Sequence, residues 1–372
     1  MKRFFSYTIL SFFLLLLPTG QASANNNDST RLSLLTCAPG EEIYSLFGHT
    51  AIRYENPSQG IDIVFNYGLF SFNTPNFIFR FSLGETDYQL GATDYERFAA
   101  EYAFFGRSVW QQTLNLTDEE KTELIRLLQE NYRPENRVYR YNFFYDNCAT
   151  RPRDKIEESI AGKVIYPAEP QDGSLTFRDI VHQYCKGHPW ARFGIDLCIG
   201  SEADQPITQR QMMFAPFYLM DAFDGAQIKG DSIQRPLITA NELVVDATPE
   251  PDQSDWMPTP LQCSLLLFIL TAAATIYGIR RRTGLWGIDL FLFGIAGIVG
   301  CVLAFLALFS QHPAVSSNFL LLVFHPGQLL FLPYIIYCVR KGKKCWYLTL
   351  NLAVLTLFIV LFPVIPQRFD FA

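Results

Sequence analysis

The chain has 372 residues, a formal net charge of −6 and 49% hydrophobic residues. That length is sufficient for two domains, and the average conceals a division: residues 25–260 have a globular composition, whereas residues 261–364 are almost devoid of charge. The net charge is modest and acidic and no basic stripe occurs, so the composition excludes nucleic acid as a partner.

The first 24 residues have the pattern of an export signal. Two basic residues precede an apolar run at 4–17, and small residues at 22–24 form a cleavage site. We expect cleavage after residue 24. If the segment remains as an anchor instead, its positive end stays in the cytoplasm and the following residues still lie outside. The sequence therefore predicts an exported domain at 25–246 in either case.

Alternation of apolar and polar residues predicts strands at the start of the exported domain. The expected segments are 33–36, 50–54, 62–67 and 77–82. Aromatic residues are frequent around the last of these. They could line an apolar groove, although aromatic side chains more often belong to a core; the residues are Phe70, Phe72, Phe77, Phe79 and Phe81.

Two helices are expected further along the exported domain. Thr117 and Glu120 form a capping box that is followed by leucines on one face, and this helix should end near Asn131, before Pro134. A second helix should begin at Cys148 or just after it, with a proline tolerated in its first turn.

The C-terminal third predicts a membrane domain at 261–364, preceded by a linker at 247–260 and followed by a tail at 365–372. Four apolar stretches have roughly the 17 to 22 residues that cross a bilayer as a helix; they are 261–279, 290–309, 318–339 and 346–362. Basic residues follow the first and third stretches, so those loops should be cytoplasmic. Four spans then return the tail to the outside, in agreement with the export signal.

His325 lies within the third apolar stretch, beside a proline and a glycine. A polar, helix-breaking site at this depth could face a substrate in the interior of the bundle, or it could simply mark a kink in the helix.

The candidate chemistry lies in the segments Phe47–Arg53 and Tyr141–Arg151. A cysteine at a helix N-terminus is expected to have a lowered thiol pKa, because unpaired amides and the helix dipole stabilise the thiolate, and the same amides could form an oxyanion hole. His49 on a neighbouring strand would act as base toward Cys148, and Asn66 would fix its tautomer. The order histidine, polar residue, cysteine is that of a circularly permuted papain-like fold.

Two neighbours of the candidate nucleophile are assigned to oxyanion stabilisation or positioning, Asn147 and Arg151. Arg151 and Arg153 could hold a phosphate group, or they could pair with Asp154 and Glu157 on a solvated helix face.

The other cysteines leave alternatives open. In an oxidising compartment Cys148 could form a structural disulfide with Cys37, Cys185 or Cys198. Cys185 and Cys198, which are close in sequence, are the better candidate pair. His182 and Cys185 have a spacing that zinc ligands also show, but exported cysteines favour disulfides, so we expect no metal.

Five segments closely resemble the Lnb-type lipoprotein N-acyltransferases: Leu35–Glu41, Phe47–Arg53, Asn66–Gly68, Leu114–Thr117 and Asp146–Arg151. The resemblance is dense from about residue 30 to 165 and extends, as topology, through the four spans. It implies an α+β, permuted papain-like domain of the NlpC/P60 and lecithin-retinol-acyltransferase-like group, anchored in the bacterial inner membrane and facing the periplasm.

The resemblance also implies a reaction in which Cys148 is the nucleophile and His49 the base. The enzyme would move a fatty acyl chain from a membrane phospholipid, through a Cys148 thioester, to the N-terminal cysteine amine of lipoproteins, and this chemistry requires no cofactor. Two rival functions remain at this point: a cell-wall cysteine endopeptidase of the NlpC/P60 type, and a non-enzymatic envelope scaffold in which Cys148 is disulfide-bonded.

Overall fold

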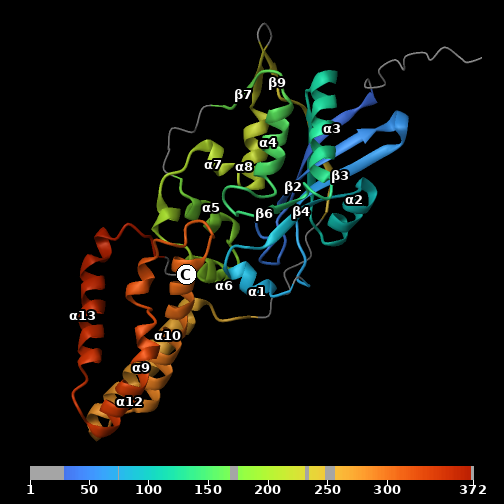
Figure 1. The fold of residues 1–372 in the computed structure, drawn as a ribbon. Helices are drawn as coiled ribbons and strands as arrows, with labels where there is room; N and C mark the ends of the chain where they lie inside the picture. Colours follow the sequence, from blue (N-terminus) through green and yellow to red (C-terminus); the bar gives the residue numbers. More distant parts are fainter. Residues whose placement is uncertain (1–28, 74, 168–174, 231–233, 248–255, 370–372) are drawn as a thin grey trace, which may run out of the picture.

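The computed structural model describes residues 29–73, 75–167, 175–230, 234–247 and 256–369. The expected signal peptide and most of the expected linker lie outside these residues. The described chain forms a mixed α/β domain and, at one end of it, a set of apolar helices (Figure 1).

The main sheet has seven antiparallel strands in the order β10-β5-β1-β2-β3-β4-β6. Their bounds are β1 Arg31–Cys37, β2 His49–Asn56, β3 Ile61–Leu69, β4 Asp87–Asp94, β5 Val109–Leu114, β6 Val138–Arg140 and β10 Ile238–Val245. A smaller sheet contains β7 Lys163–Ile165, β8 Gln227–Lys229 and β9 Gln234–Pro236. The first three predicted strands are confirmed as β1, β2 and β3.

The main sheet is covered on one face by α2 Tyr95–Phe104 and on the other by α3 Asp118–Tyr132, α4 Thr150–Ser159 and α8 Pro216–Asp224. A separate cluster is formed by α5 Phe177–Tyr184, α6 Pro189–Cys198 and α7 Gln209–Met212. The capping box is confirmed: Thr117 Oγ1 accepts from the Glu120 amide, and the Glu120 carboxylate accepts from the Thr117 amide. The second predicted helix is α4, which begins two residues after Cys148.

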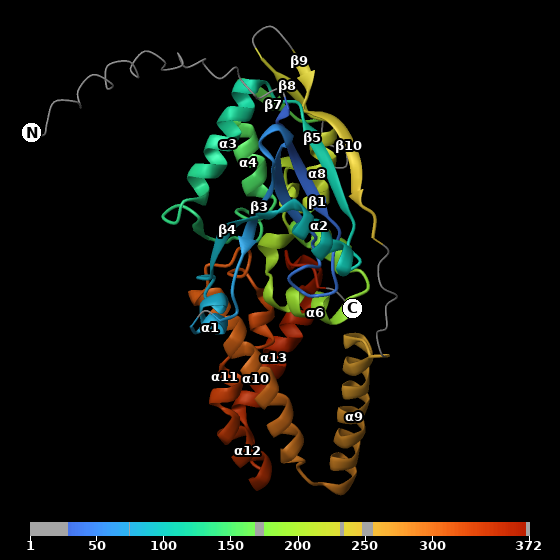
Figure 2. The same ribbon diagram turned by 90° about the vertical axis from the view of Figure 1, so that its right-hand side faces the viewer.

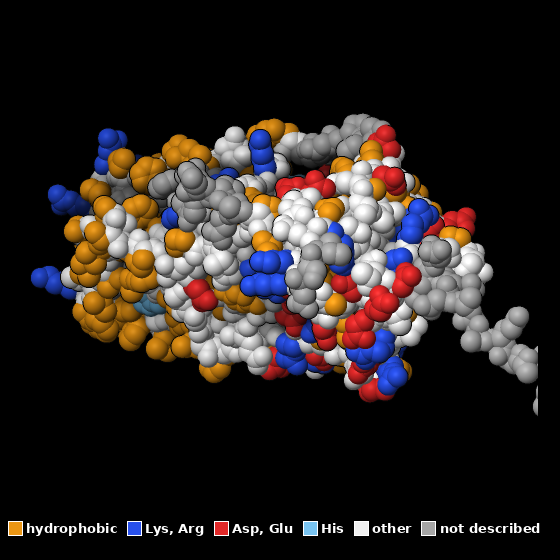
Figure 3. All heavy atoms as spheres, turned by 90° about the horizontal axis from the view of Figure 1, so that it is seen from above, with side chains coloured by type: hydrophobic (Ala, Val, Ile, Leu, Met, Phe, Trp, Pro, Cys, Tyr) orange, Lys and Arg blue, Asp and Glu red, His pale blue; other side chains and the backbone are white. Residues whose placement is uncertain are grey.

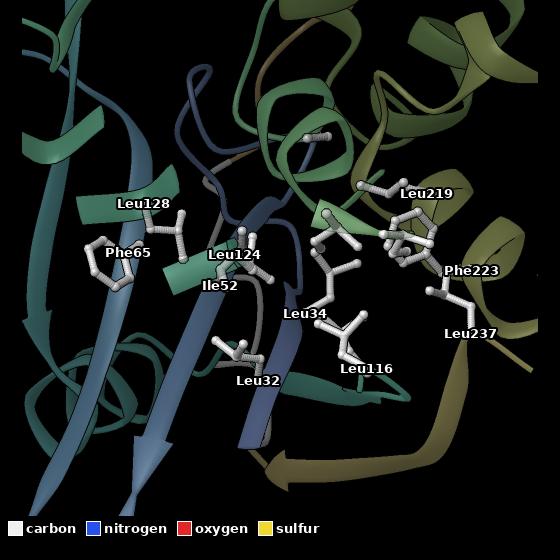
Figure 4. Packing of buried hydrophobic residues seen from close by; sticks show 14 of the residues in the cluster. Leu32, Leu34, Ile52, Phe65, Leu116, Leu124, Leu128, Leu219, Phe223 and Leu237 are labelled. Carbon is white, nitrogen blue, oxygen red and sulfur yellow. The ribbon is translucent and has the colours of Figure 1, made fainter. Parts of the chain in front are cut away.

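The core follows from the two-residue period of the strands, which sends neighbouring side chains to opposite faces. Leu32 and Leu34 of β1 pack under α3, α4 and α8, in the cluster of buried residues shown in Figure 4. Leu35 of the same strand faces the other way, toward Phe98 of α2. The sheet is therefore covered on both faces, and chemistry is possible only at its ends.

One predicted strand is wrong, because residues Phe77–Ser82 form helix α1. Three consecutive apolar residues, Phe77 to Phe79, cannot alternate between a core face and a solvent face. In the structure Ile78 is 79% exposed and Phe79 is 58% exposed, so neither belongs to the core of the sheet domain. Instead α1 lies at the end of the domain nearest the apolar helices (Figure 2).

Three of the described helices are long and apolar enough to cross a membrane: α9 Pro260–Arg281, α10 Trp286–Phe309 and the segment Trp346–Val364, which begins with α13 Trp346–Leu361. The third apolar stretch is broken into a 3-10 turn at Phe319–Leu322, α11 Gly327–Leu330 and α12 Leu332–Lys341. The segment Phe319–Leu330 is bent by 72° relative to α12. The described residues thus contain four spans only if this bent pair counts as one. Figure 3 shows hydrophobic side chains gathered over this end of the molecule, with charged ones over the other.

His325 lies between the 3-10 turn and α11, within the first part of the bent pair and not at the 72° bend, so it marks a separate interruption of the helix. Gly300 of α10 packs directly against His325, since a Cβ at Gly300 would lie 2.5 Å from the His325 backbone nitrogen. Pro326 cannot donate a backbone hydrogen bond, and the Gln328 side chain compensates by donating to the Val323 carbonyl at 2.7 Å.

The end of the chain ties the two parts together. Gln367 is buried; its side chain donates to the Ile199 carbonyl of the sheet domain and to Asn318 Oδ1, both at 3.2 Å. Arg368 pairs with Asp179 of α5 at 2.6 Å. The C-terminal segment therefore lies on the same side as the α/β domain, as the predicted topology requires.

Candidate active site

The loop before α4 holds Cys148 through the side chain of Asn147. Asn147 Oδ1 accepts hydrogen bonds from the amides of the two residues after Cys148, at 2.8 and 2.9 Å, which caps the start of α4. Its Nδ2 donates to the carbonyls of Phe143 and Phe214, both at 2.8 Å. Because both of its N–H bonds are used in this way, the Asn147 side chain can position the nucleophile but cannot donate to an oxyanion.

A gap between β2 and β3 receives the thiol. The pairing of these strands ends at Ala51 with Asn66, and β3 then bulges through Gly68, whose φ is +91°. A Cβ at Gly68 would lie 3.4 Å from Cys148 Cβ. The amide of Thr50, just beyond the last paired residue of β2, therefore hydrogen-bonds to Cys148 Sγ.

His49 and Asn66 also meet at this end of the sheet. His49 Nε2 lies 3.1 Å from Asn66 Oδ1. An amide oxygen can only accept, so this contact assigns the imidazole proton to Nε2 and leaves the lone pair on Nδ1. His49 precedes Thr50, whose amide contacts the thiol, so His49 and Asn66 lie at the same end of the sheet as Cys148.

The pKa values of the pair differ from the sequence-based expectation. Burial raises the pKa of Cys148 to about 11, although the Thr50 amide and the Tyr141 hydroxyl oppose this effect. The pKa of His49 is lowered to about 4, mainly by burial; the Asn66 contact opposes this shift and nearby Arg107 adds to it. The prediction of a thiolate near neutral pH is therefore wrong, because desolvation outweighs the helix terminus. The resting pair is a neutral thiol and a neutral imidazole.

Tyr141 is a site residue to which the sequence analysis gave no role. Its hydroxyl donates to Cys148 Sγ, and burial keeps the Tyr141 pKa well above its ordinary value, so it remains a donor. Its ring stacks on Tyr88 of β4 with centroids 4.2 Å apart. The hydroxyl of Tyr139 is near Gly68 and has no hydrogen-bond partner among the described residues. Both tyrosines lie within or just before the segment that carries Cys148, which was the only available sequence signal.

The arginines beside the nucleophile are occupied. Arg151 forms a bidentate pair with Asp146, at 2.6 and 2.7 Å, and its guanidinium lies 3.5 Å from the centre of the Tyr139 ring. The alternative in which Arg151 and Arg153 pair with Asp154 and Glu157 is confirmed in part: Arg153 pairs with Asp154 at 2.8 Å, whereas Arg151 pairs with Asp146. Arg151 positions the loop that carries Cys148.

The predicted disulfide between Cys185 and Cys198 is also wrong, because both thiols are free in the structure. Cys185 is buried at the end of α5, within the cluster formed by α5, α6 and α7. His182 Nε2 lies 2.8 Å from Asp196 Oδ2. Among the described residues no group of three potential ligands could hold a metal ion.

The fold and the site together define a mixed α/β domain that carries a cysteine, a histidine and an asparagine at one end of its sheet and is joined to apolar membrane helices. Comparison with protein families gives the same division of the chain. Residues 20–182 match the Lnb N-terminal periplasmic domain and residues 252–372 match the Lnb transmembrane domain. The chain belongs to the Lnb-type family, as its sequence resemblance predicted. Comparison with curated proteins and with solved structures gives no significant match.

Proposed function

We propose that the chain is a cysteine-dependent lipoprotein N-acyltransferase of the bacterial inner membrane, built on a permuted papain-like periplasmic domain with a four-span anchor. One observation carries the proposal: two donors from other residues, the amide of Thr50 and the hydroxyl of Tyr141, lie against the Cys148 thiol, at the end of the sheet that holds the His49–Asn66 pair. This arrangement suits acyl transfer, in which a sulfur attacks a carbonyl and negative charge develops next to it.

The first half-reaction forms a thioester. His49 Nδ1 takes the thiol proton as Cys148 Sγ attacks the carbonyl carbon of a phospholipid ester. The developing oxyanion accepts hydrogen bonds from the same donors that surround the sulfur. When the carbon–oxygen bond of the ester breaks, His49 returns the proton to the departing glycerol oxygen, so a lysophospholipid leaves and the acyl chain stays on Cys148.

The second half-reaction forms the amide. The N-terminal amine of a lipoprotein attacks the thioester carbonyl, and His49 takes one amine proton. The carbon–sulfur bond then breaks and the proton returns to Cys148. The products are an N-acylated lipoprotein and the free thiol. A neutral His49, as its lowered pKa provides, is the protonation state that both half-reactions require.

The structure bears differently on the two rival functions. The scaffold hypothesis requires a disulfide bond at Cys148, whereas this thiol is free in the structure. A cell-wall endopeptidase would share the cysteine and histidine, but it has no need for the tight attachment of the domain to membrane helices through Asn318 and Gln367.

The test compares a reporter lipoprotein from cells in which wild type, Cys148→Ala or His49→Ala is the only copy. Tandem mass spectrometry should locate a fatty amide on the N-terminal cysteine with wild type and with neither variant, at equal protein levels. An amide that persists with Cys148→Ala would rule out the thioester mechanism. Isotope-labelled phospholipid shows whether the chain comes from a phospholipid or from the lipoprotein's own diacylglyceryl group.

A further inference from the structure

A large apolar groove lies between α1 of the sheet domain and α10 of the membrane domain. Its volume is about 940 Å³, within the range of about 300–1,000 Å³ that is typical of small-molecule sites. The residues that line it are Phe72, Asn76, Phe77, Ile78, Phe79, Ser82, Cys301, Val302, Phe305 and Leu306.

The two walls of the groove are held together by contacts at its upper edge. The Gln311 amide, two residues after α10, donates to the Leu83 carbonyl at 2.9 Å, and His312 Nε2 bonds to the Phe81 carbonyl at 2.6 Å. Below these contacts the rings of Phe79 and Phe305 lie 6.0 Å apart. The groove is thus a defined feature at the end of α10 that adjoins the periplasmic domain.

The lining of the groove is exposed although it is apolar. Phe72 is 64% exposed, Ile78 is 79% exposed and Val302 is 52% exposed. A contiguous apolar surface of this kind marks a site of interaction, and here one wall belongs to a membrane helix. Among the described residues that line the groove, Asn76 and Ser82 are the polar ones, so the groove offers few hydrogen-bond partners to the backbone of a peptide.

A continuous series of aromatic rings leads from the groove to the nucleophile. Phe77 in the groove stacks on Phe70 with centroids 5.9 Å apart, and Phe70 contacts Tyr88 at 5.1 Å. Tyr88 stacks on Tyr141 at 4.2 Å, and the Tyr141 hydroxyl donates to Cys148 Sγ. Apolar contact therefore extends without a break from the membrane helix to the reactive thiol.

We infer that this groove binds one acyl chain of a membrane phospholipid, which enters sideways from the outer leaflet and is guided by the aromatic series until its ester carbonyl reaches Cys148. The inference rests on the proposed function and assigns it a substrate site. An acyl chain fits these walls because it has no polar groups to satisfy, and the groove opens where such chains are already present.

The binding test uses the full-length Cys148→Ala protein, which retains the groove but cannot react. The protein is placed in vesicles that contain a phosphatidylethanolamine with a diazirine on its acyl chain, and is then irradiated. We expect adducts concentrated on the peptides around Phe77 and Val302, with competition by unmodified phospholipid. Equal labelling of the lipid-facing sides of α9, α10 and α13 would reveal annular lipid only and would overturn the inference.

A matched pair of substitutions on α10 tests the role of the groove in catalysis. Val302→Trp fills the groove, whereas Leu308→Trp changes an exposed apolar residue on the same helix that does not line it. We expect Val302→Trp to lower both groove labelling and Cys148 acylation by about tenfold, because tryptophan excludes several methylene groups, while Leu308→Trp changes either by less than about twofold.

The two proposals fail in different ways. If wild type forms no acyl-enzyme with phospholipid, the proposed function is wrong, whatever the groove binds. If wild type forms it and Val302→Trp forms it equally fast, the groove is not the acyl site although the chemistry stands. Labelling that requires a diacylated lipoprotein, and does not occur with phospholipid alone, would overturn the choice of occupant.

Discussion

At Cys148 two physical effects act on the same thiol in opposite directions. The start of α4, the Thr50 amide and the Tyr141 hydroxyl favour the thiolate, whereas burial favours the thiol. Burial prevails, and it also keeps His49 neutral. The pair is therefore a neutral thiol and a neutral imidazole and not a preformed ion pair, and in the proposed reaction we expect proton transfer to accompany attack on the carbonyl.

The first prediction concerns alkylation of Cys148 by iodoacetamide, followed by peptide mass spectrometry. Because only the thiolate reacts and the pKa is raised to about 11, the rate should rise with every step in pH up to about pH 10. The slope should be about tenfold per pH unit. A rate that is constant between about pH 6 and 9 would indicate a preformed thiolate. In urea, where burial is lost, the reaction at pH 8 should become faster.

The second prediction concerns the role of Asn66 as a positioning residue. In wild type, kcat/KM for a short-chain ester should fall as the pH falls through about 4, because His49 becomes protonated and can no longer act as base. Asn66→Asp places a carboxylate beside Nε2, favours the charged imidazole and should move this acid limb upward by about 1–3 pH units. Asn66→Ala should lower kcat and move the limb downward, because it removes the contact that raises the His49 pKa. An unshifted limb in Asn66→Asp would contradict the contact.

At the level of elements, the site depends on where a strand stops pairing. The ladder between β2 and β3 ends at Ala51 and Asn66, β3 then bulges against β4 between Asn66 and Leu69, and Gly68 in this bulge leaves room for Cys148. The same logic applies at α1, which is a helix because its consecutive apolar residues cover the groove and have no strand to pair with. Both irregularities face the proposed path of the substrate.

The third prediction compares two glycines with positive φ. Gly68→Ala and Gly60→Ala should each lose roughly 1–2 kcal/mol of stability, because both backbones are left-handed, with φ of +91° and +64°. Only the first has a neighbour in the site, since a Cβ at Gly68 meets Cys148 and one at Gly60 meets nothing within 4 Å. We therefore expect similar melting temperatures and a loss of ester hydrolysis in Gly68→Ala alone. Equal activities would show that the bulge does not shape the thiol pocket.

For the whole molecule, the attachment of the domain to its anchor determines which substrates the thiol can reach. Asn318 donates to the Leu197 carbonyl at 2.8 Å, and Gln367 bonds to Asn318 and to the Ile199 carbonyl. These contacts hold the end of α6 against the membrane helices, on the same molecular end as the groove. A soluble ester does not need this arrangement, but a lipid in a bilayer does.

The fourth prediction separates these two kinds of substrate. The double substitution Gln367→Ala, Arg368→Ala removes the buried tie and the pair with Asp179. Four side-chain hydrogen bonds are lost. At about 1 kcal/mol for each, N-acylation of a lipoprotein in vesicles should fall by roughly 100-fold or more, while hydrolysis of a soluble ester stays near wild type. Arg31→Ala, which breaks an exposed pair with Glu55 on the sheet, serves as the control. Equal losses of both activities would point to misfolding of the domain.

The sequence by itself determined the features that depend on neighbouring residues. The two-residue period identified β1, β2 and β3, the capping box identified the start of α3, and charge-free runs identified the apolar membrane helices. The segments around His49 and Cys148 also pointed to the Lnb-type family. Each of these signals lies within a few turns of chain, so no packing was needed to recognise it.

Only the tertiary structure decided the features that depend on contacts between distant residues. The raised pKa of Cys148 comes from burial among β3, β4 and β6, the bulge at Gly68 from the fit of the α4 loop, and the helical state of α1 from its place beside α10. Desolvation and close packing are sums over many neighbours, and most of those neighbours are far away in the sequence. That is why Tyr141, the free cysteines and the groove emerged only from the folded chain.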